Sequence, residues 1–455
     1  MNRPVALLLT LLLAGFAPIA SAGNDWLITH VNLVPMDREQ ILADQNVLIR
    51  DGKIARIWSG PVTGHDEAKQ IDGSGKFLLP GLTEMHAHIP GESSDQLDWV
   101  LLLYAANGVT TVRGMLGEPS HLKLREQLAG GGKRGPRLVT SGPSFNGRSV
   151  RGTAQATAMV ESQKAAGYDF LKLHPGLHLD EFEAIAKAAN RLRIPFAGHV
   201  SRDVGLERAL ASGQSSIDHL DGYLIWLAGD AKRDPGFFGF ALTDQLMPEK
   251  IPDIARKTAA SGIWLVPTES LMINVAGTET VASLQTRDEM RYVPENLLDN
   301  WSSSKRDFQA AGNYSAERAG RYLAVRQSLI KALYDAGANL LLGSDAPQIF
   351  NVPGFSLHRE LEIMVDAGLS PFQALELGTV NAARYFGQEQ YQGVIREGAV
   401  ADLLLLDANP LEDIGNSRRI AGVMLRGDWL SRDWLDQELA RIEESVTGKD
   451  SGSAN

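Results

Sequence analysis

Two histidines stand where a strand-like apolar run of the sequence ends. His86 and His88 are two positions apart at the end of the run 78–88. An extended strand sends side chains i and i+2 to the same face, so both imidazoles point the same way. Such a pair can bind one divalent metal ion. A lone histidine is more often a packing or surface residue than a metal ligand. The position of the pair in the fold must therefore decide whether it binds a metal.

Four more side chains that can bind metal ions occupy the ends of later runs. They are Lys172 in Phe-Leu-Lys-Leu-His, His199 in Ala-Gly-His-Val, His219 in Ile-Asp-His-Leu and Asp345 in Gly-Ser-Asp-Ala. Each has an ordinary explanation on its own, since Asp345 could cap a helix and Lys172 could form a buried ion pair. Six such groups at strand ends are hard to explain by packing. The sequence therefore predicts a metal centre.

The elements that must position these residues alternate between apolar strand-like runs and helical segments. The eight runs are 78–88, 109–113, 138–141, 170–174, 195–200, 216–220, 263–267 and 339–345. Segments with one apolar face, such as 179–192 and 357–367, lie between them. Eight strand-helix units predict an α/β protein with a parallel (β/α)8 barrel, also called a TIM barrel, over residues 80–389. Barrel enzymes carry their chemistry at the C-terminal strand ends, which is where the candidates lie.

The flanking segments predict a second domain. Short strands separated by turn signals occupy 23–79 and 390–432, and we expect them to form one discontinuous small β-sandwich domain. Residues 433–455 predict a C-terminal helix followed by a loose polar tail. Two connections, 223–261 and 268–338, are too long for simple loops and rich in aromatic residues. They could cover the barrel mouth, or they could be packing helices or the surface of a homo-oligomer.

The first 22 residues predict a secretory signal peptide. Arg3 precedes an apolar run, and Ala20-Ser21-Ala22 fits the small-x-small cleavage rule. A membrane anchor is the alternative, but the run is short for a span and is broken by Gly15 and Pro18. No later run is long enough to cross a bilayer. We therefore expect an exported protein, periplasmic or secreted, that does not stay in the membrane after cleavage.

Composition excludes several other classes. The chain has 455 residues, a net charge of −11 and no cysteine. The negative charge argues against a nucleic-acid-binding surface, which needs a positive field. Without cysteine, a metal must be held by histidine, carboxylate or a modified lysine. No Gly-x-Ser-x-Gly elbow of a serine hydrolase and no phosphate-binding glycine-rich loop is evident.

Several motifs resemble the amidohydrolase superfamily, in particular the branch with imidazolonepropionases and secreted prolidase-like dipeptidases. The resemblance runs over almost the whole chain. The motifs are Pro80-Gly81-Leu82 leading to His86-Ala87-His88, Ala197-Gly198-His199-Val200, Ser216-Ile217-Asp218-His219-Leu220, Gly343-Ser344-Asp345-Ala346 and Gly398-Ala399-Val400-Ala401-Asp402-Leu403.

The resemblance implies a binuclear site. In it His86, His88 and Asp345 hold one divalent ion, His199 and His219 hold the other, and Lys172 bridges the two as a carbamate. Zinc is favoured because it suits histidine and oxygen ligands, with manganese, iron and nickel as alternatives. The segment between Lys172 and His199 is short for carbamate-bearing relatives. An unmodified Lys172 beside a mononuclear site, as in imidazolonepropionases, is therefore the competing arrangement.

The expected chemistry is hydrolysis by a metal-activated hydroxide, with Asp345 passing a proton from water to the leaving group. His174 and Tyr223 follow strand-end ligands, so either could donate a hydrogen bond to the substrate carbonyl. Arg113 could bind a substrate carboxylate or form an internal salt bridge. We expect a small amide substrate such as a dipeptide or N-acyl amino acid. Cyclic amides, lactones or esters are the alternative, and a non-catalytic ligand-binding barrel is a remote one.

Overall fold

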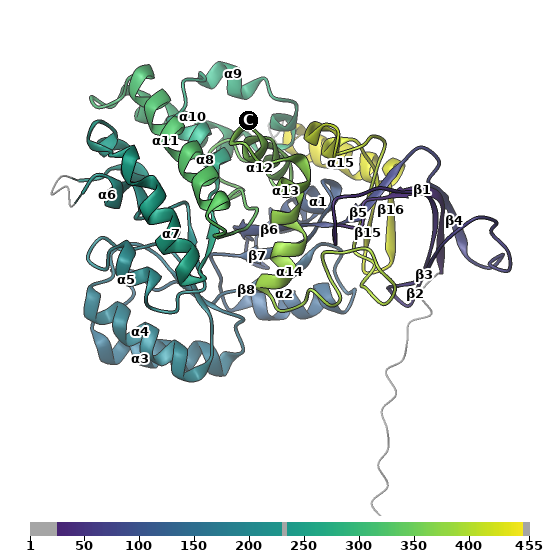
Figure 1. The fold of residues 1–455 in the computed structure, drawn as a ribbon, viewed down its shortest axis with the longest axis horizontal. Coiled ribbons are helices and arrows are strands. Elements are labelled where there is room, and N and C mark those ends of the chain that lie inside the picture. The colour runs from purple at the N-terminus through teal and green to yellow at the C-terminus, as the bar shows by residue number, and fades with distance from the viewer. Residues whose placement is uncertain (1–24, 230–233, 449–455) are drawn as a thin grey trace, which may run out of the picture.

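The computed structural model describes residues 25–229 and 234–448 and shows two parts side by side (Figure 1). The predicted signal peptide and the tail after residue 448 lie outside the described residues. One part is a sheet built from both ends of the chain. The other part, at the opposite end of the molecule, contains parallel strands among helices. Within the described residues, no helix has the length and apolar content needed to cross a membrane.

The sheet built from the two chain ends has eight strands. They are β1 (Trp26–Leu33), β2 (Leu42–Arg50), β3 (Lys53–Ser59), β4 (Lys69–Asp72), β5 (Phe77–Pro80), β14 (Leu403–Leu406), β15 (Ile420–Leu425) and β16 (Asp428–Ser431). Their order is β16-β15-β14-β5-β1-β2-β3, with β4 beside β1. The terminal segments therefore pair as the sequence predicts. They form one sheet that curls until Ile54 N reaches Ala399 O at 2.9 Å, rather than two separate facing sheets.

The other part contains eight strands that follow one another along the chain. They are β6 (Leu82–Ala87), β7 (Val109–Gly114), β8 (Arg137–Thr140), β9 (Leu171–Leu173), β10 (Phe196–Gly198), β11 (Ser216–Asp218), β12 (Trp264–Val266) and β13 (Asn339–Leu340). All their pairings are parallel, in one three-stranded sheet β6-β7-β8 and one five-stranded sheet β9–β13. Parallel bridges also join Ser141 to Phe170 and Ala87 to Ala346. Single bridges thus join the two sheets at both edges, and a closed (β/α)8 barrel stays a prediction.

The first and last predicted runs differ from the structure. The run 78–88 is two strands, because the chain changes sheet at Gly81. Gly81 N bonds to Asp402 O in the curled sheet at 2.9 Å, and Leu82 N bonds to Gly108 O in the barrel part at 2.9 Å. A Cβ at Gly81 would lie 2.1 Å from the Thr110 side chain, so only glycine fits this crossing. The last run is a strand only over Asn339–Leu340.

Helices lie between and around the parallel strands (Figure 1). They are α1 (Leu97–Ala106), α2 (Ser120–Ala129), α3 (Thr153–Ala166), α4 (Leu179–Leu192), α5 (Leu206–Leu210), α6 (Tyr223–Leu227), α7 (Ile251–Ser261), α8 (Glu269–Ala276), α9 (Val281–Gln285), α10 (Glu295–Ala310), α11 (Ala316–Asp335), α12 (Phe355–Asp366), α13 (Pro371–Gly378), α14 (Val380–Tyr385) and α15 (Arg432–Gly448), with short 3-10 turns at Phe237–Gln245, Pro248–Lys250, Asp288–Tyr292 and Ile414–Arg418. The helix predicted over 179–192 has those bounds, and α15 is the predicted C-terminal helix.

The two long connections form ordered helices. The first supplies α6 and α7, and the second supplies α8 to α11. One element of the first connection, the turn Phe237–Gln245, also reaches the strand ends, where Phe238 packs against His199 and His219. Both the covering role and the packing role are therefore present in these connections.

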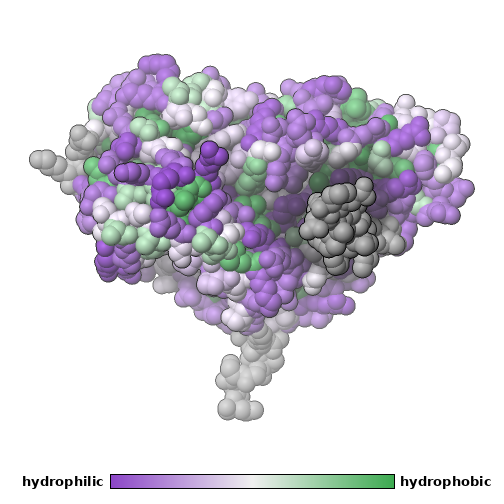
Figure 2. Space-filling model, turned by 90° about the horizontal axis from the view of Figure 1, so that it is seen from below, coloured by the Kyte–Doolittle hydropathy of each residue, from purple (hydrophilic) through white to green (hydrophobic). Residues whose placement is uncertain are grey.

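On the face in Figure 2, hydrophobic residues are scattered among hydrophilic ones. The large hydrophobic side chains exposed among the described residues are Ile41, Leu116, Leu179 and Tyr391. A homo-oligomer stays a prediction.

Candidate active site

The six predicted metal ligands come together at the C-terminal ends of the parallel strands. His86 is the second-last residue of β6 and His88 follows that strand. Lys172 lies in β9, His199 follows β10, His219 follows β11, and Asp345 lies after β13. The ring centroids of His86 and His219 are 4.5 Å apart, and those of His199 and His219 are 4.8 Å apart. Residues distant in the sequence thus form one compact cluster.

Three of these residues can share one ion. His86, His88 and Asp345 each offer a ligand atom, and the three atoms lie within 4.8 Å of one another. Asp345 Oδ1 is 2.8 Å from His88 Nε2 and 3.5 Å from His86 Nε2. Both Asp345 Oδ1 and His86 Nδ1 are buried without a hydrogen-bond partner. Since buried polar atoms nearly always have partners, the residues present fit a metal ion here.

His199 and His219 are oriented by neighbours that contact their Nδ1 atoms. His199 Nδ1 lies 3.1 Å from Asp221 Oδ2, which also accepts a bond from Val200 N at 3.2 Å. His219 Nδ1 lies 2.8 Å from Thr268 Oγ1. Partners of this kind fix the ring of a metal-binding histidine and leave Nε2 to act as the ligand.

Burial keeps several imidazoles of the cluster neutral. It is the main cause that places the pKa values of His86 and His219 well below the ordinary value. It also lowers the pKa of His174 to about 2, with a further contribution from the Lys172 charge. The neutral imidazole has a free lone pair and is the form that binds metal.

Lys172 is fully buried and faces an aspartate. Its Nζ has no hydrogen-bond partner and lies 3.7 Å from Asp218 Oδ2. The same oxygen is 3.3 Å from His86 Nδ1. Burial lowers the pKa of Lys172 and so favours the neutral amine, whereas the charge of Asp218 opposes this shift.

Arg113 forms an internal salt bridge rather than facing solvent. Its guanidinium donates to Asp218 Oδ1 at 3.1 Å, to Tyr385 Oη at 2.8 Å and to Met85 O at 2.7 Å. It also donates to Ser216 Oγ at 3.0 Å, and the side chain is fully buried. Of its two predicted roles, the structure shows the internal one.

A buried glutamate links the strand of His86 to the loop of Asp345. Glu84 accepts bonds from His86 N and Ser344 N, both at 2.9 Å, and from Ser344 Oγ at 2.5 Å. Gly343 has no room for a side chain, because a Cβ there would lie 2.5 Å from Val266. These contacts explain the Gly-Ser-Asp sequence at this position: glycine allows the close approach and serine forms the link that positions Asp345.

Several non-glycine residues here have left-handed backbone conformations. The φ angles are 65° at His219, 54° at Thr268, 64° at Asp345 and 43° at Phe238. Such conformations cost energy outside glycine and gather at functional sites. Such residues occur in this cluster, and others, such as His30 and Arg426, lie in the sheet built from the chain ends.

Phe238 covers the second pair of histidines. Its ring centroid is 5.0 Å from that of His219 and 6.0 Å from that of His199, nearly parallel to the latter at 19°. Phe237 packs edge-on against it at 4.8 Å. An aromatic wall therefore stands beside the ligands and reduces their contact with water.

The two predicted carbonyl donors have different positions. His174 is half-buried, and its ring stacks on that of His199 with centroids 5.1 Å apart. Its Nδ1 is buried without a partner, so the ring is available to a substrate through its other edge. Tyr223 does not face the cluster: it is fully buried, and its hydroxyl lies 2.9 Å from Thr258 Oγ1 on α7. The predicted role of Tyr223 is therefore wrong.

Sequence reasoning missed Asp218, Asp221, Thr268 and Phe238. Asp218 and His219 are adjacent, and strand alternation would send them to opposite faces. Both reach the cluster because β11 ends at Asp218 and His219 turns into a left-handed conformation. Only the acidic residues in Ile-Asp-His-Leu-Asp could have given a signal.

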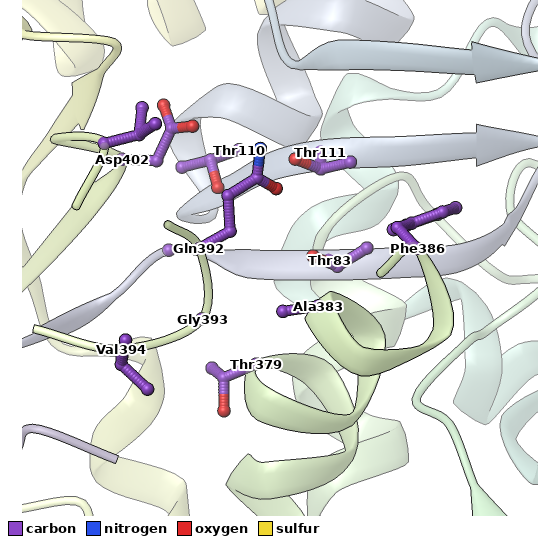
Figure 3. A pocket seen from close by; sticks show the side chains of 12 residues that line it. Thr83, Thr110, Thr111, Thr379, Ala383, Phe386, Gln392, Gly393, Val394 and Asp402 are labelled. Atoms are coloured by element: carbon purple, nitrogen blue, oxygen red, sulfur yellow. The ribbon is translucent and has the colours of Figure 1, made fainter. Parts of the chain in front are cut away.

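A small cavity at the other end of the parallel strands is not part of this site. Figure 3 shows the side chains of Thr110, Gln392 and Asp402 grouped around it. It encloses about 20 Å³, which is room for about one water molecule. It lies at the starts of β6 and β7, whereas the metal-binding residues lie at strand ends.

Comparisons with known proteins identify the family of the chain. Residues 77–430 match the model of the Amidohydrolase family. An adenine deaminase from Deinococcus deserti is 25% identical over 382 residues, which is 82% of this chain and 54% of the deaminase. The chain thus spans about half the length of that relative.

Two solved structures have the same fold. Bottromycin amidohydrolase aligns with a TM-score of 0.74 and 21% identity, covering 94% of this chain and 92% of that one. A Xaa-Pro dipeptidase with bound methionine in its active site aligns with a TM-score of 0.63 and 18% identity, covering 90% and 100%. The family match covers most of the chain and includes every predicted ligand. The chain therefore belongs to the amidohydrolase family, whose members are metal-dependent hydrolases.

Proposed function

We propose that this protein hydrolyses an amide bond in a small substrate such as a dipeptide or an N-acyl amino acid. The observation that carries the proposal is the group His86, His88 and Asp345, in which each residue offers one ligand atom and the three atoms lie within 4.8 Å of one another. Asp345 Oδ1 is also buried without a hydrogen-bond partner. The fold neighbours named an amidohydrolase and a Xaa-Pro dipeptidase support an amide substrate.

The proposed metal set has two ions. His86, His88 and Asp345 hold the first, and His199 and His219 hold the second through Nε2. Zinc suits this donor set best. When bound, divalent ions lower the pKa of a water molecule and polarise a carbonyl, which makes amide hydrolysis feasible near neutral pH.

Lys172 is proposed to join the two ions as a carbamate. The neutral amine attacks carbon dioxide, a nitrogen–carbon bond forms, and one proton leaves to solvent. Burial prepares the amine for this step because it lowers the pKa of Lys172. The product presents two oxygens where the amine has none to offer.

Asp345 and His174 take the proton and hydrogen-bond roles. Asp345 lies against His88 and His86 and accepts a proton from the attacking water, then returns it to the leaving nitrogen. His174 stays neutral at physiological pH because its pKa is about 2, so its ring N–H can donate to the substrate carbonyl as charge develops there.

A mononuclear site is the second candidate. It is favoured by the 3.7 Å approach of Lys172 Nζ to Asp218 Oδ2, which would be an ion pair if the lysine were unmodified. In that case cyclic amides, lactones or esters become the leading substrates. Export to the periplasm or the medium is part of the proposal in either case and rests on residues 1–22.

The test is metal content per chain in protein produced with zinc and ¹³C-bicarbonate. Wild type is compared with Lys172→Ala and with Lys187→Ala, an exposed lysine on α4 that serves as the control. Two metals and a carbamate carbon signal by NMR, both lost only in Lys172→Ala, support the binuclear site. One metal per chain in wild type and the same content in Lys172→Ala support the mononuclear site. Absence of stoichiometric metal from wild type would end the hydrolase proposal.

A further inference from the structure

A groove opens directly beside the metal ligands. Its volume is about 570 Å³, within the range of small-molecule sites. Its walls are residues 144–148 after β8, residues 174–176 after β9, and Leu116 after β7. His174 belongs both to this wall and to the cluster, because its ring stacks on His199. A molecule in the groove would thus extend from the metal ligands outward.

The loop that forms one wall is fixed to the strand that carries Lys172. Phe145 N donates to Lys172 O, and His174 N donates to Phe145 O, both at 2.8 Å. At its tip, Asn146 Oδ1 accepts from Arg148 N at 2.8 Å. Gly147 packs so closely that a Cβ would lie 2.3 Å from Gly176 O. The backbone of Arg148 is therefore held in a defined place relative to the cluster.

Arg148 gives the groove its charge. The lining contains no carboxylate, lysine or second arginine, so Arg148 supplies the permanent positive charge of the wall. Among the described residues, none forms a hydrogen bond or ion pair with its guanidinium. Arg151 on the same loop differs, since it donates to Gly147 O at 3.2 Å. A guanidinium with unused donors matches a carboxylate in shape and charge.

The remaining wall is apolar. Leu116, which is 45% exposed, lines the groove together with Pro175. Neutral polar groups of Ser144 and Asn146 complete the lining. This lining matches the amino-acid half of a substrate, because the cation suits its carboxylate and the apolar wall suits its side chain. They do not match a substrate that carries a free amine at this end.

We infer that this groove is the binding site for the amino-acid half of the substrate, with Arg148 pairing with its free carboxylate and Leu116 contacting its apolar side chain. The inference rests on the proposed function and assigns the residues that recognise the carboxylate and the side chain of its substrates. The scissile carbonyl then lies toward His174 and the ligands.

Paired substrates test the role of Arg148. N-acetyl-leucine and glycyl-leucine are each compared with the matching C-terminal carboxamide, using metal-loaded wild type, Arg148→Met and Arg151→Met, with release of the amine followed by mass spectrometry. Arg148→Met should lower kcat/KM for the acids roughly 10- to 100-fold, mainly through KM, because a charge-assisted bond is lost. The carboxamides should change less than about threefold. Arg151→Met should affect acids and carboxamides alike, because Arg151 contacts only the backbone of the wall at Gly147.

A binding measurement separates this inference from the proposed function. N-methanesulfonyl-leucine has no scissile carbonyl, and its affinity can be measured by calorimetry without turnover. If no amide is hydrolysed but Arg148→Met weakens this acid tenfold or more, the proposed function fails and the inference stands. If amides are hydrolysed and Arg148→Met affects acids and carboxamides alike, only the inference is overturned. Neither turnover nor Arg148-dependent binding would overturn both.

Discussion

Replacement of Arg326 tests whether the helical layer holds His219 in place. Arg326 on α11 is fully buried, and its guanidinium donates to both carboxylate oxygens of Glu269 at 2.6–3.0 Å. It also donates to His219 O at 2.8 Å. His219 has a left-handed backbone, so this bond stabilises a conformation that is otherwise unfavourable.

Arg326→Met should therefore have two effects. It leaves the Glu269 carboxylate buried without its cation, which costs about 3–5 kcal/mol of stability. It also releases the His219 carbonyl, and loss of such a supporting contact should weaken metal binding roughly 10- to 100-fold. The stability change is measured by urea denaturation, and the metal affinity by competition with a chelator.

Two further variants make the result decisive. Arg321→Met removes an arginine from the same helix whose ion pairs with Asp244 and Glu317 are half-exposed, so it should cost about 1 kcal/mol or less. The double variant Arg326→Met, Glu269→Gln removes both buried charges and should recover part of the stability, but not the metal affinity. If Arg326→Met costs no more than Arg321→Met, or leaves metal affinity unchanged, the reasoning is refuted.

Three other predictions follow from single contacts. Phe238→Ala should lower kcat/KM roughly 5- to 30-fold for substrates with a bulky apolar group near the cluster, because apolar contact is lost. Values for glycine-based substrates should stay nearly unchanged. Equal losses for both kinds of substrate would count against an aromatic wall. Burial raises the pKa of Glu360 to about 8, so its contribution to stability is full below pH 4.5 and is lost as the pH rises through 8. The melting temperature of Glu360→Gln should lack this decline. Parallel curves of melting temperature against pH for wild type and variant would contradict the prediction. His358→Leu should cost about 1–3 kcal/mol by leaving Asn107 O and Ser417 without their partner, with metal content per chain unchanged; a loss of metal would show that His358 supports the site.

The part of the site that sequence could predict is the part built on regular strands. His86 and His88 follow two-residue alternation along β6, and Lys172 lies within β9, so their faces could be counted from the sequence. The eight runs could be recognised because buried parallel strands are continuous apolar segments. The pairing of the chain ends could be predicted because short strands need partners.

The residues of the site that could not be predicted lie where the backbone is no longer in a strand. After β11 the chain turns left-handed at His219 and Leu220 and again at Gly222, where φ is 84°. Helix α6 then begins at Tyr223 and directs its side chain to Thr258, so counting positions from His219 gave the wrong residue. Phe238 reaches the cluster from a long connection whose path no local pattern specifies.

The sheet made from both chain ends has a consequence for biosynthesis. Strand β5 has its partner β14 near the end of the chain, so the apolar edge with Leu78 and Leu79 stays unpaired until the ribosome has nearly finished. Pairing over so long a separation is slow, and such an edge invites aggregation. A premature stop before residue 403 would thus leave β5 unpaired as well as removing the C-terminal residues. Strand β5, left without its partner β14, continues through Gly81 directly into β6, the strand that leads to His86 and His88.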